Sequence, residues 1–250
     1  MQVLEIAEGV EVVEELPVIY LRKHKTLVLA DTHIGFEEEM ASQGIYVPSF
    51  QLMRVMDILE KALEARDVSK VVIAGDFKHI FSGLGDSERR ELSKIITYLL
   101  PRVDDLIVVR GNHDNYLPIL QRKFPFEIVD HYLVGNILII HGHKPIPNVE
   151  GWDTLIFGHE HPSIVIRDSL GTVGKYSCFL RGRLKNGKYF ITLPAVGAYQ
   201  TGSRVTLSRD TYISPILRDY AVLEEIEPVI VDDEVGLLEL PKLRELADLI

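Results

Sequence analysis

The sequence predicts an α/β fold in which a parallel sheet with crossover helices is followed by a strand-rich half. Between residues 26 and 109, apolar runs of strand length alternate with two amphipathic stretches of helical period, the order typical of a parallel sheet. Beyond residue 136 the chain reads largely as short strands separated by turn residues. The 250 residues show no internal repeat or linker, so we expect a single domain spanning residues 1–250.

Two hairpins are predicted at the N-terminus. Residues 3–6 and 10–13 alternate apolar and polar side chains on either side of a Glu-Gly turn signal. Residues 18–21 and 26–29 form a similar pair around a basic tip. The second hairpin therefore ends directly before the polar stretch that begins at Asp31.

Two helices are predicted where apolar side chains recur every three or four residues. The first begins after Ser49, a good N-cap residue, and ends near Arg66. The second runs from about Asp86 to Leu100 and stops before a proline. The other elements expected in this half are strands at residues 70–74 and 106–109 and a short helix at residues 116–123.

The second half is expected to be built from strands and one terminal helix. Asn186-Gly187 is a strong hairpin signal, and Pro241 is a permitted first residue for a helix over 241–250. We interpret the acidic and apolar stretch 224–239 as an outer strand with a solvated loop rather than as a binding tail. The expected strands comprise residues 136–140, 154–157, 164–167, 176–184, 188–193 and 220–226.

Composition excludes several classes of protein. Hydrophobic residues make up 46% of the chain and the mean hydropathy is +0.10, and no apolar run is long enough to span a bilayer. The N-terminus lacks the pattern of a signal peptide, so we expect a cytoplasmic protein without a membrane partner. The single Cys178 excludes an internal disulfide and a thiolate metal site. The net charge of −10 argues against a broad basic face for nucleic acid.

Polar side chains follow five of the predicted strands where each strand ends. Open α/β sheets place their ligands at the carboxyl ends of strands, so these side chains are expected to meet. Seven of the nine histidines lie in these short motifs, whereas His24 and His131 do not. The motifs contain Asp31 and His33, Asp76 and His79, Asn112, His113 and Asp114, His141 and His143, and His159 and His161.

The types of side chain indicate a metal centre. Carboxylates, an amide oxygen and imidazoles without a thiolate suit Mn²⁺, Fe²⁺ or Zn²⁺ rather than a structural tetrahedral zinc ion. The motifs contain enough ligands for two adjacent ions that share one bridging carboxylate. Two-metal sites with ions about 3.5–4 Å apart support in-line displacement at phosphorus.

In their order and strand-end context, the five motifs resemble the signature of the calcineurin-like metallophosphoesterases. The resemblance covers residues 31–161. It implies a four-layer α/β/β/α sandwich, in which helices flank two central sheets, and an enzyme that hydrolyses phosphoesters with two divalent metal ions.

The same resemblance implies a role for each motif residue. Asp31, His33 and His161 would bind the first metal, Asp76 would bridge, and Asn112, His141 and His159 would complete the second. His113 would remain unligated and act as the catalytic acid or stabilise charge on the phosphoryl group. His143 either supports the ligands or is only a turn residue, and Asp114 is interpreted as fixing the turn around His113.

One departure narrows the choice within the family. Many members place an acidic residue three positions after the bridging aspartate, where it pairs with the catalytic histidine, but here that position is His79. This pattern resembles the SbcD-type DNA nucleases and their small archaeal relatives, and we include His79 among the catalytic residues. The segment 193–202 resembles a glycine-rich loop of stand-alone relatives associated with DNA repair. The chain is too short for the capping and coiled-coil-binding regions of an SbcD protein, which argues against a partner ATPase of that kind.

We therefore expect a Mn²⁺-dependent phosphodiesterase that cleaves nucleic acid, DNA in preference to RNA, with DNA-repair proteins and a second copy of the chain as candidate partners. Arg181, Arg183, Lys185, Lys188 and Arg204 could supply a basic rim, although a solvated hairpin face explains the first four equally well. The alternatives are a small-molecule phosphodiesterase or phosphatase, for example on cyclic nucleotides, and a non-catalytic scaffold. A scaffold would be expected to lose metal ligands or the catalytic histidine, and none is missing.

Overall fold

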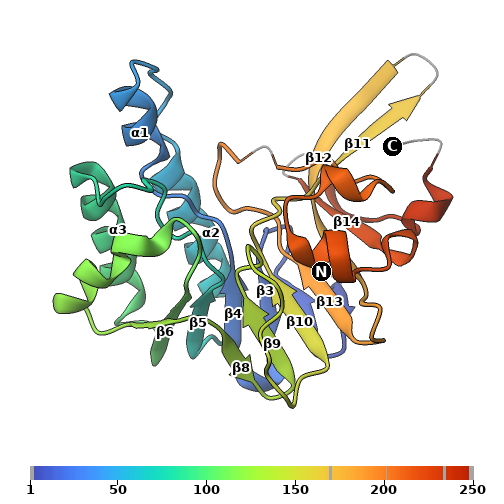
Figure 1. Cartoon of the computed structure of the whole chain (residues 1–250). Helices are drawn as coiled ribbons and strands as arrows, with labels where there is room; N and C mark the ends of the chain where they lie inside the picture. Colours follow the sequence, from blue (N-terminus) through green and yellow to red (C-terminus); the bar gives the residue numbers. More distant parts are fainter. Residues whose placement is uncertain (1–2, 169–170, 201, 233–234, 248–250) are drawn as a thin grey trace.

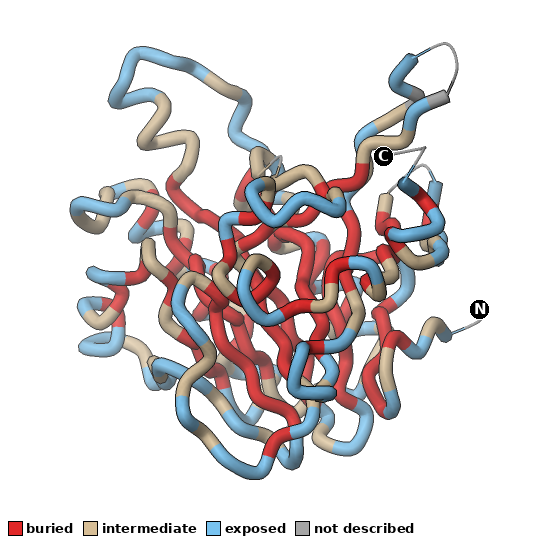
Figure 2. The backbone as a smooth tube through the Cα atoms, turned by 45° about the vertical axis from the view of Figure 1, so that its right-hand side comes forward, coloured by how far each residue is buried: buried red, intermediate tan, exposed pale blue. Residues whose placement is uncertain are grey.

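Two β-sheets lie face to face in the computed structural model, which describes residues 3–168, 171–200, 202–232 and 235–247 (Figure 1). Three apolar clusters hold the layers together, one between the sheets and one on the outer face of each. Successive residues of one strand divide between clusters: Leu27 and Leu29 face the helices, whereas Val28 faces the other sheet. Figure 2 shows this buried interior running through the strands. The expected α/β sandwich is confirmed.

The first sheet has seven strands in sequence order. Both predicted hairpins are present as antiparallel pairs, and the last four strands are parallel, as the strand–helix alternation predicted. The strands are β1 (Glu5–Ala7), β2 (Val10–Val12), β3 (Ile19–Leu21), β4 (Thr26–Leu29), β5 (Lys70–Ile73), β6 (Asp105–Val109) and β7 (Glu127–Val129).

Helices α2 (Gln51–Ala65) and α3 (Asp86–Leu99) cover the outer face of this sheet (Figure 1). The start predicted for α2 is wrong by one residue: Phe50, not Ser49, is the N-cap and offers no side-chain hydrogen bond. The carboxylate of Glu37 instead accepts the backbone N–H of Gln51 at 2.8 Å. A distant acidic side chain thus replaces the local cap.

Two further helical segments accompany the first sheet. Helix α1 (Phe36–Ser42) was not predicted, because none of its residues is buried and its sequence has no apolar period. The short helix expected at 116–123 is the 3₁₀ helix η2 (Asp114–Arg122).

The second sheet has eight strands in the order β15-β14-β12-β13-β10-β9-β8, with β11 paired to β12. Strands β9, β10 and β13 are parallel to one another, and the Asn-Gly turn joins β12 to β13 as predicted. The strands are β8 (Tyr132–Val134), β9 (Ile137–Ile140), β10 (Thr154–Phe157), β11 (Ser163–Asp168), β12 (Gly171–Arg183), β13 (Tyr189–Thr192), β14 (Glu227–Asp232) and β15 (Gly236–Glu239).

Short helical turns, rather than long helices, cover the outer face of the second sheet. The strand predicted at 220–226 is wrong, because Ala221, Leu223 and Ile226 are buried at spacings that fit turns and not an alternating strand. The strand lies next in sequence, at β14. The turns are η3 (Arg209–Thr211), η4 (Ile216–Tyr220), η5 (Leu223–Glu225) and η6 (Leu243–Glu245), and η1 (Arg22–His24) forms the basic tip in the first sheet.

The helix predicted at 241–250 is reduced to η6 within the described residues, and positions 248–250 lie outside them. The outer strand expected within 224–239 is confirmed as β14 and β15. No helix in the described ranges is long and apolar enough to cross a membrane.

Candidate metal centre

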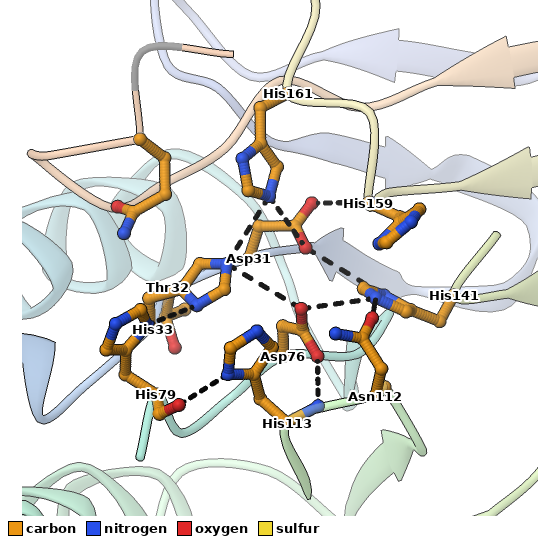
Figure 3. A network of polar contacts seen from close by, with 12 residues as sticks. Asp31, Thr32, His33, Asp76, His79, Asn112, His113, His141, His159 and His161 are labelled. Carbon is orange, nitrogen blue, oxygen red and sulfur yellow. Dashed lines mark hydrogen bonds and ion pairs between the residues drawn. The ribbon is translucent and has the colours of Figure 1, made fainter. Parts of the chain in front are cut away.

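The motif side chains converge from the carboxyl ends of strands in both sheets (Figure 3). The backbone there is unusual. Seven described residues other than glycine have positive φ, and five of them belong to the predicted ligand set. Such strained backbone persists where the surrounding structure requires it and is typical of functional sites. The five are Asp31 (φ 56°), His33 (43°), Asp76 (49°), His159 (67°) and His161 (46°).

Two glycines allow the carboxylates to fit between the strand ends. A Cβ atom on Gly111 would lie 2.1 Å from Oδ1 of Asp76, and one on Gly158 would lie 2.5 Å from Oδ2 of Asp31. Both distances are shorter than van der Waals contact, and the buried carboxylates of Asp76 and Asp31 cannot move away. The glycines that precede Asn112 and His159 are therefore required by packing against the other motifs.

Asp31, His33 and His161 form the first group, with one ligand atom from each within 4.8 Å of the others. Nε2 of His161 lies 3.3 Å from Oδ1 of Asp31 and 3.3 Å from Nε2 of His33. The other oxygen of Asp31 accepts the backbone N–H of His159 at 2.8 Å, which ties this group to the end of β10.

Asp76, His141 and His159 form the second group within the same limit. Oδ1 of Asn112 lies 3.1 Å from Nε2 of His141 and joins it. Oδ2 of Asp76 lies 3.3 Å from Nε2 of His141 and 3.7 Å from Nε2 of His33, so it faces both groups (Figure 3). The structure thus brings together all seven predicted ligands in the expected division, with Asp76 between them.

The donor set fits a pair of divalent cations. Oδ1 of Asp31 is buried and accepts no hydrogen bond from any described residue, an arrangement that a cation would satisfy. Burial alone would raise the pKa of Asp31, but His161 and His141 outweigh it and lower that pKa. The pKa of Asp76 is likewise held well below its usual range against burial, chiefly by His141. Both carboxylates are therefore ionised at neutral pH, the form that binds metal.

The imidazoles differ in charge. Burial lowers the pKa of His33 to about 3, and burial together with His141 lowers that of His159 to about 4. Burial would also lower the pKa of His141, yet Asp76 raises it to about 9. In the metal-free protein His141 carries the proton that a metal ion would have to displace.

His113 is not one of the predicted ligands but lies beside the first group: its ring is 5.1 Å from that of His33, and one nitrogen from each of His33, His79 and His113 lies within 4.8 Å of the others. Its backbone N–H donates to Oδ1 of Asp76 at 2.9 Å, and its Nδ1 contacts the backbone carbonyl of His79. A carbonyl oxygen can only accept, so Nδ1 carries a proton and Nε2 is the nitrogen left for chemistry. The ring of His79 stacks on that of His113, with centroids 5.1 Å apart and an interplanar angle of 12°. The predicted neighbours are in contact, through ring faces and a carbonyl rather than through a bond between imidazoles.

Asp114 fixes the turn around His113, as predicted. Its carboxylate is fully buried and accepts the backbone N–H groups of Gly111 at 2.8 Å and Lys78 at 3.2 Å. Burial and the nearby Asp76 raise the pKa of Asp114 to about 6.

His143 lies beside the second group, with its ring 5.2 Å from that of His141 and 6.1 Å from that of His159. Burial lowers its pKa to about 4, and its Nδ1 is buried without a hydrogen-bond partner among the described residues. It also lines a cavity of about 240 Å³ whose wall contains Arg110 and Lys144.

Several supporting residues were missed by the sequence analysis. Gln51 is fully buried: its amide donates to the carbonyls of Thr32 and His33, and its oxygen accepts the N–H of Ala198 at 2.9 Å. It therefore links the first motif to the segment 193–202. A polar residue in the first turn of an amphipathic helix gives no sequence signal for such a contact.

Glu160 and Ser214 connect the last two motifs. The buried carboxylate of Glu160 accepts the N–H of Ser214 at 2.7 Å, and the hydroxyl of Ser214 donates to the carbonyl of Gly142 at 2.8 Å. Burial raises the pKa of Glu160. The turn carrying His159 and His161 is thereby anchored to the loop that carries His141.

Lys78 and Glu88 form a second buried pair, beneath His79 and His113. Both side chains are 0% exposed and their charged atoms are 3.7 Å apart. The ammonium group of Lys78 donates to the carbonyl of His113 at 3.0 Å, while Glu88 accepts the N–H of His79 at 2.8 Å. Burial lowers the pKa of Lys78 and raises that of Glu88.

The basic rim that the sequence suggested is not formed. Arg183 pairs in register with Tyr189 at the start of β13, which lies at the end of the sheet opposite the motifs. Arg181 is neutralised by Glu227 at 2.9 Å and Glu239 at 2.7 Å. Lys185 and Lys188 donate to backbone carbonyls. Among the five residues, Arg204 is the one near the motifs. It forms a β-bridge with Ser163, the first residue of β11, which lies two positions after His161.

Asp76 lies between imidazoles of both groups, an arrangement that suits two divalent metal ions. A family model described as calcineurin-like phosphoesterase matches residues 24–163, more than half of the chain. The chain belongs to this family and is a metal-dependent phosphoesterase that uses divalent metal ions.

One solved structure supports the same fold. The nuclease MPE of Pseudomonas putida has a TM-score of 0.64 at 20% identity, over 95% of this chain and 99% of that chain. The protein of unknown function AQ665 from Aquifex aeolicus is 21% identical over 59% of this chain and 82% of that chain, with a TM-score of 0.37. No curated protein matches the sequence.

Proposed function

We propose that this phosphoesterase is a two-metal phosphodiesterase that cleaves nucleic acid, DNA in preference to RNA, within a single domain. We base the choice of substrate on the cavity of about 240 Å³ that adjoins the second group. Its wall contains Arg110, His131 and Lys144 beside His141 and His143. A polymer with one phosphate at the metal centre would place a neighbouring phosphate here.

The charges of this cavity suit a phosphate. The guanidinium of Arg110 is partly balanced by Asp130 at 3.5 Å, whereas Lys144 is exposed at the cavity mouth. In a chain with a net charge of −10, this is cationic surface directly beside the predicted ligands. A few phosphate contacts of this kind favour local engagement of a strand over tight binding of a long duplex.

In this proposal, the first group would hold one ion, the second group with Asn112 would hold the other, and Asp76 would serve both. Two divalent ions there would supply activation of water and stabilisation of charge during displacement at phosphorus. His113 then acts as the catalytic acid: the carbonyl of His79 retains the Nδ1 proton, so the Nε2 proton is the one available to the leaving oxygen. The stacked ring of His79 keeps His113 in this orientation.

The ligand chemistry favours Mn²⁺. Carboxylate, amide oxygen and imidazole donors without thiolate match Mn²⁺, and Fe²⁺ or Zn²⁺ are the competing ions. The full-length similarity to a solved structure named as a nuclease supports the nucleic-acid substrate. A role in DNA repair, with repair proteins or a second copy as partners, belongs to the same proposal and rests on the resemblance of the segment 193–202 to repair-associated relatives.

A small-molecule phosphodiesterase is the second candidate. Pockets that enclose small ligands commonly measure about 300–1,000 Å³. The cavity beside the second group is smaller, at about 240 Å³, which favours a substrate that extends beyond it. A non-catalytic scaffold is the least supported reading, since all seven predicted ligands and His113 converge.

The test is a substrate panel with Mn²⁺, Fe²⁺, Zn²⁺ and Mg²⁺, using single- and double-stranded oligonucleotides, bis-(p-nitrophenyl) phosphate and cyclic nucleotides. We expect Mn²⁺ to support cleavage of oligonucleotides. Lys144→Ala should raise KM several-fold more for an oligonucleotide than for bis-(p-nitrophenyl) phosphate and lower the salt slope by about one. Hydrolysis of the small diesters with no cut in any oligonucleotide would disprove the nuclease proposal and leave the diesterase standing.

A further inference from the structure

His33 is connected to a carboxylate through a second histidine. Nδ1 of His33 lies 3.0 Å from Nδ1 of His79, and Nε2 of His79 lies 3.2 Å from Oε2 of Glu39. The exposed fraction of the side chain falls along this line, from 30% for Glu39 to 16% for His79 and 5% for His33. The line therefore runs from the surface of α1 to the metal centre.

The positions of the ring protons follow from the two ends of this line. Nε2 of His33 faces the first group, 3.3 Å from Nε2 of His161, so it is the nitrogen that would bind metal and Nδ1 carries the proton. Only one of the two facing Nδ1 atoms can hold a proton between them, so His79 accepts there. Its own proton is then on Nε2, directed at the carboxylate of Glu39.

We propose that Glu39 and His79 are positioning residues for the first metal ion, because Glu39 fixes the tautomer of His79 and His79 in turn fixes the tautomer and ring orientation of His33. Metal-binding histidines usually donate their second N–H directly to a carboxylate or carbonyl, and loss of that partner typically costs about 10–100-fold in metal affinity. Here one extra imidazole is inserted between ligand and carboxylate. The inference rests on the proposed assignment of His33 as a ligand.

Helix α1 is held firmly enough to present Glu39, although none of its residues is buried. Each glutamate of the run 37–39 has a separate partner: Glu37 accepts the N–H of Gln51 and Glu38 accepts the N–H of Glu88, both at 2.8 Å. These bonds fasten α1 to the first turns of α2 and α3, where the helix dipole also favours a carboxylate. The acidic residues 37–39, which in the sequence resemble a solvated helix face, therefore each make a specific contact.

Aromatic rings complete the support around His79. The ring of Phe36, the first residue of α1, packs 5.0 Å from that of His79 and stacks on Tyr199 at 4.9 Å with an interplanar angle of 14°. His79 is thus held between Phe36 and His113. These contacts hold the ring plane of His79, and within that plane its Nδ1 faces His33 and its Nε2 faces Glu39.

The experiment is a calorimetric titration of Mn²⁺ into the metal-free full-length protein, which measures the affinity of each ion without reference to activity. Glu39→Gln should lower the affinity for the ion held by the first group about 10–100-fold. The affinity for the other ion should stay within twofold of the wild-type value. Glu60→Gln is the matched control, since it removes the same charge from the exposed face of α2. It should bind both ions as the wild type does.

Non-additivity separates positioning from a general loss of structure. His79→Ala should weaken the same ion, and the double variant Glu39→Gln/His79→Ala should bind no more weakly than His79→Ala, because Glu39 acts only through His79. The melting temperature of metal-free Glu39→Gln should equal that of Glu60→Gln. Additive losses, or wild-type affinity in Glu39→Gln, would overturn the inference. If His33→Ala also bound both ions normally, the ligand assignment itself would be at fault.

Discussion

Replacing Lys78 by methionine should destabilise the protein more than any exposed lysine could. Lys78 and Glu88 are both 0% exposed, and among the described residues the ammonium group has the carboxylate of Glu88 and two backbone carbonyls as its partners. Methionine fills a similar volume but removes the charge. The carboxylate of Glu88 would then remain buried without its cation.

The expected loss of folding stability depends on the hydrogen bonds that Glu88 retains. Breaking a buried ion pair by removing one partner costs about 3–5 kcal/mol. Glu88 keeps three backbone N–H donors, from His79 and Ile80 at 2.8 Å and from Gly85 at 3.2 Å, so we expect the lower end of that range. For a chain of this size each kcal/mol lowers the melting temperature by about 2–4 °C, so a loss of ~3 kcal/mol corresponds to roughly 6–12 °C.

The assay is thermal unfolding by calorimetry at pH 7 in metal-free buffer. Lys61→Met is the control, because the pair that Lys61 makes with Asp57 at 2.8 Å is about half exposed and should contribute only about 0.5 kcal/mol. A Lys78→Met variant that melts within 2 °C of Lys61→Met would show that the buried pair of Lys78 and Glu88 does not stabilise the fold.

Three further predictions concern the metal centre. His113→Ala should lower kcat about 10²–10⁴-fold on a nucleotide diester and far less on bis-(p-nitrophenyl) phosphate, whose leaving group needs no proton; equal losses in steady-state kinetics would contradict acid catalysis. Mn²⁺ at about 100 times its Kd should stabilise the fold by about 2.7 kcal/mol and raise the melting temperature by roughly 5–11 °C, and a melting curve indifferent to Mn²⁺ would argue against specific sites. Because the pKa of His141 is raised to about 9, metal binding at pH 7 should release about one proton from it, and affinity should rise as pH increases toward 9. Calorimetry in buffers of different ionisation enthalpy measures that proton, and its absence would show that His141 is already neutral.

The parts of the site that could be predicted share a local signal. Each predicted ligand lies within four residues of the end of an apolar strand, and parallel pairing of β4, β5 and β6 brings the first three motifs to one edge without any knowledge of packing. The chemistry of the side chains then sufficed to propose metal binding. The four-layer arrangement, by contrast, came from the resemblance and not from periodicity.

The parts that could not be predicted depend on contacts between distant segments. Helix α1 has no apolar face to detect, since it is held by Glu37 and Glu38 rather than by burial. One of these contacts, from Glu37 to the N–H of Gln51, also caps α2 in place of the predicted Ser49. The sequence left open whether the basic residues form a rim, because this depends on distant contacts: the register of β12 with β13 places Arg183 at the end of the sheet away from the motifs, and Glu227 and Glu239 neutralise Arg181.

In the proposed function, two metal ions would share Asp76 and act together on a phosphodiester. The most direct measurement is a Mn²⁺ titration of the wild type and of Asp76→Ala, with bound metal counted by elemental analysis and diester hydrolysis followed at each point. We expect two ions per wild-type chain and turnover that appears only as the second ion binds. Asp76→Ala should hold no more than one ion tightly and show no turnover. Two tightly held ions in Asp76→Ala, or full turnover with one ion in the wild type, would contradict this proposal.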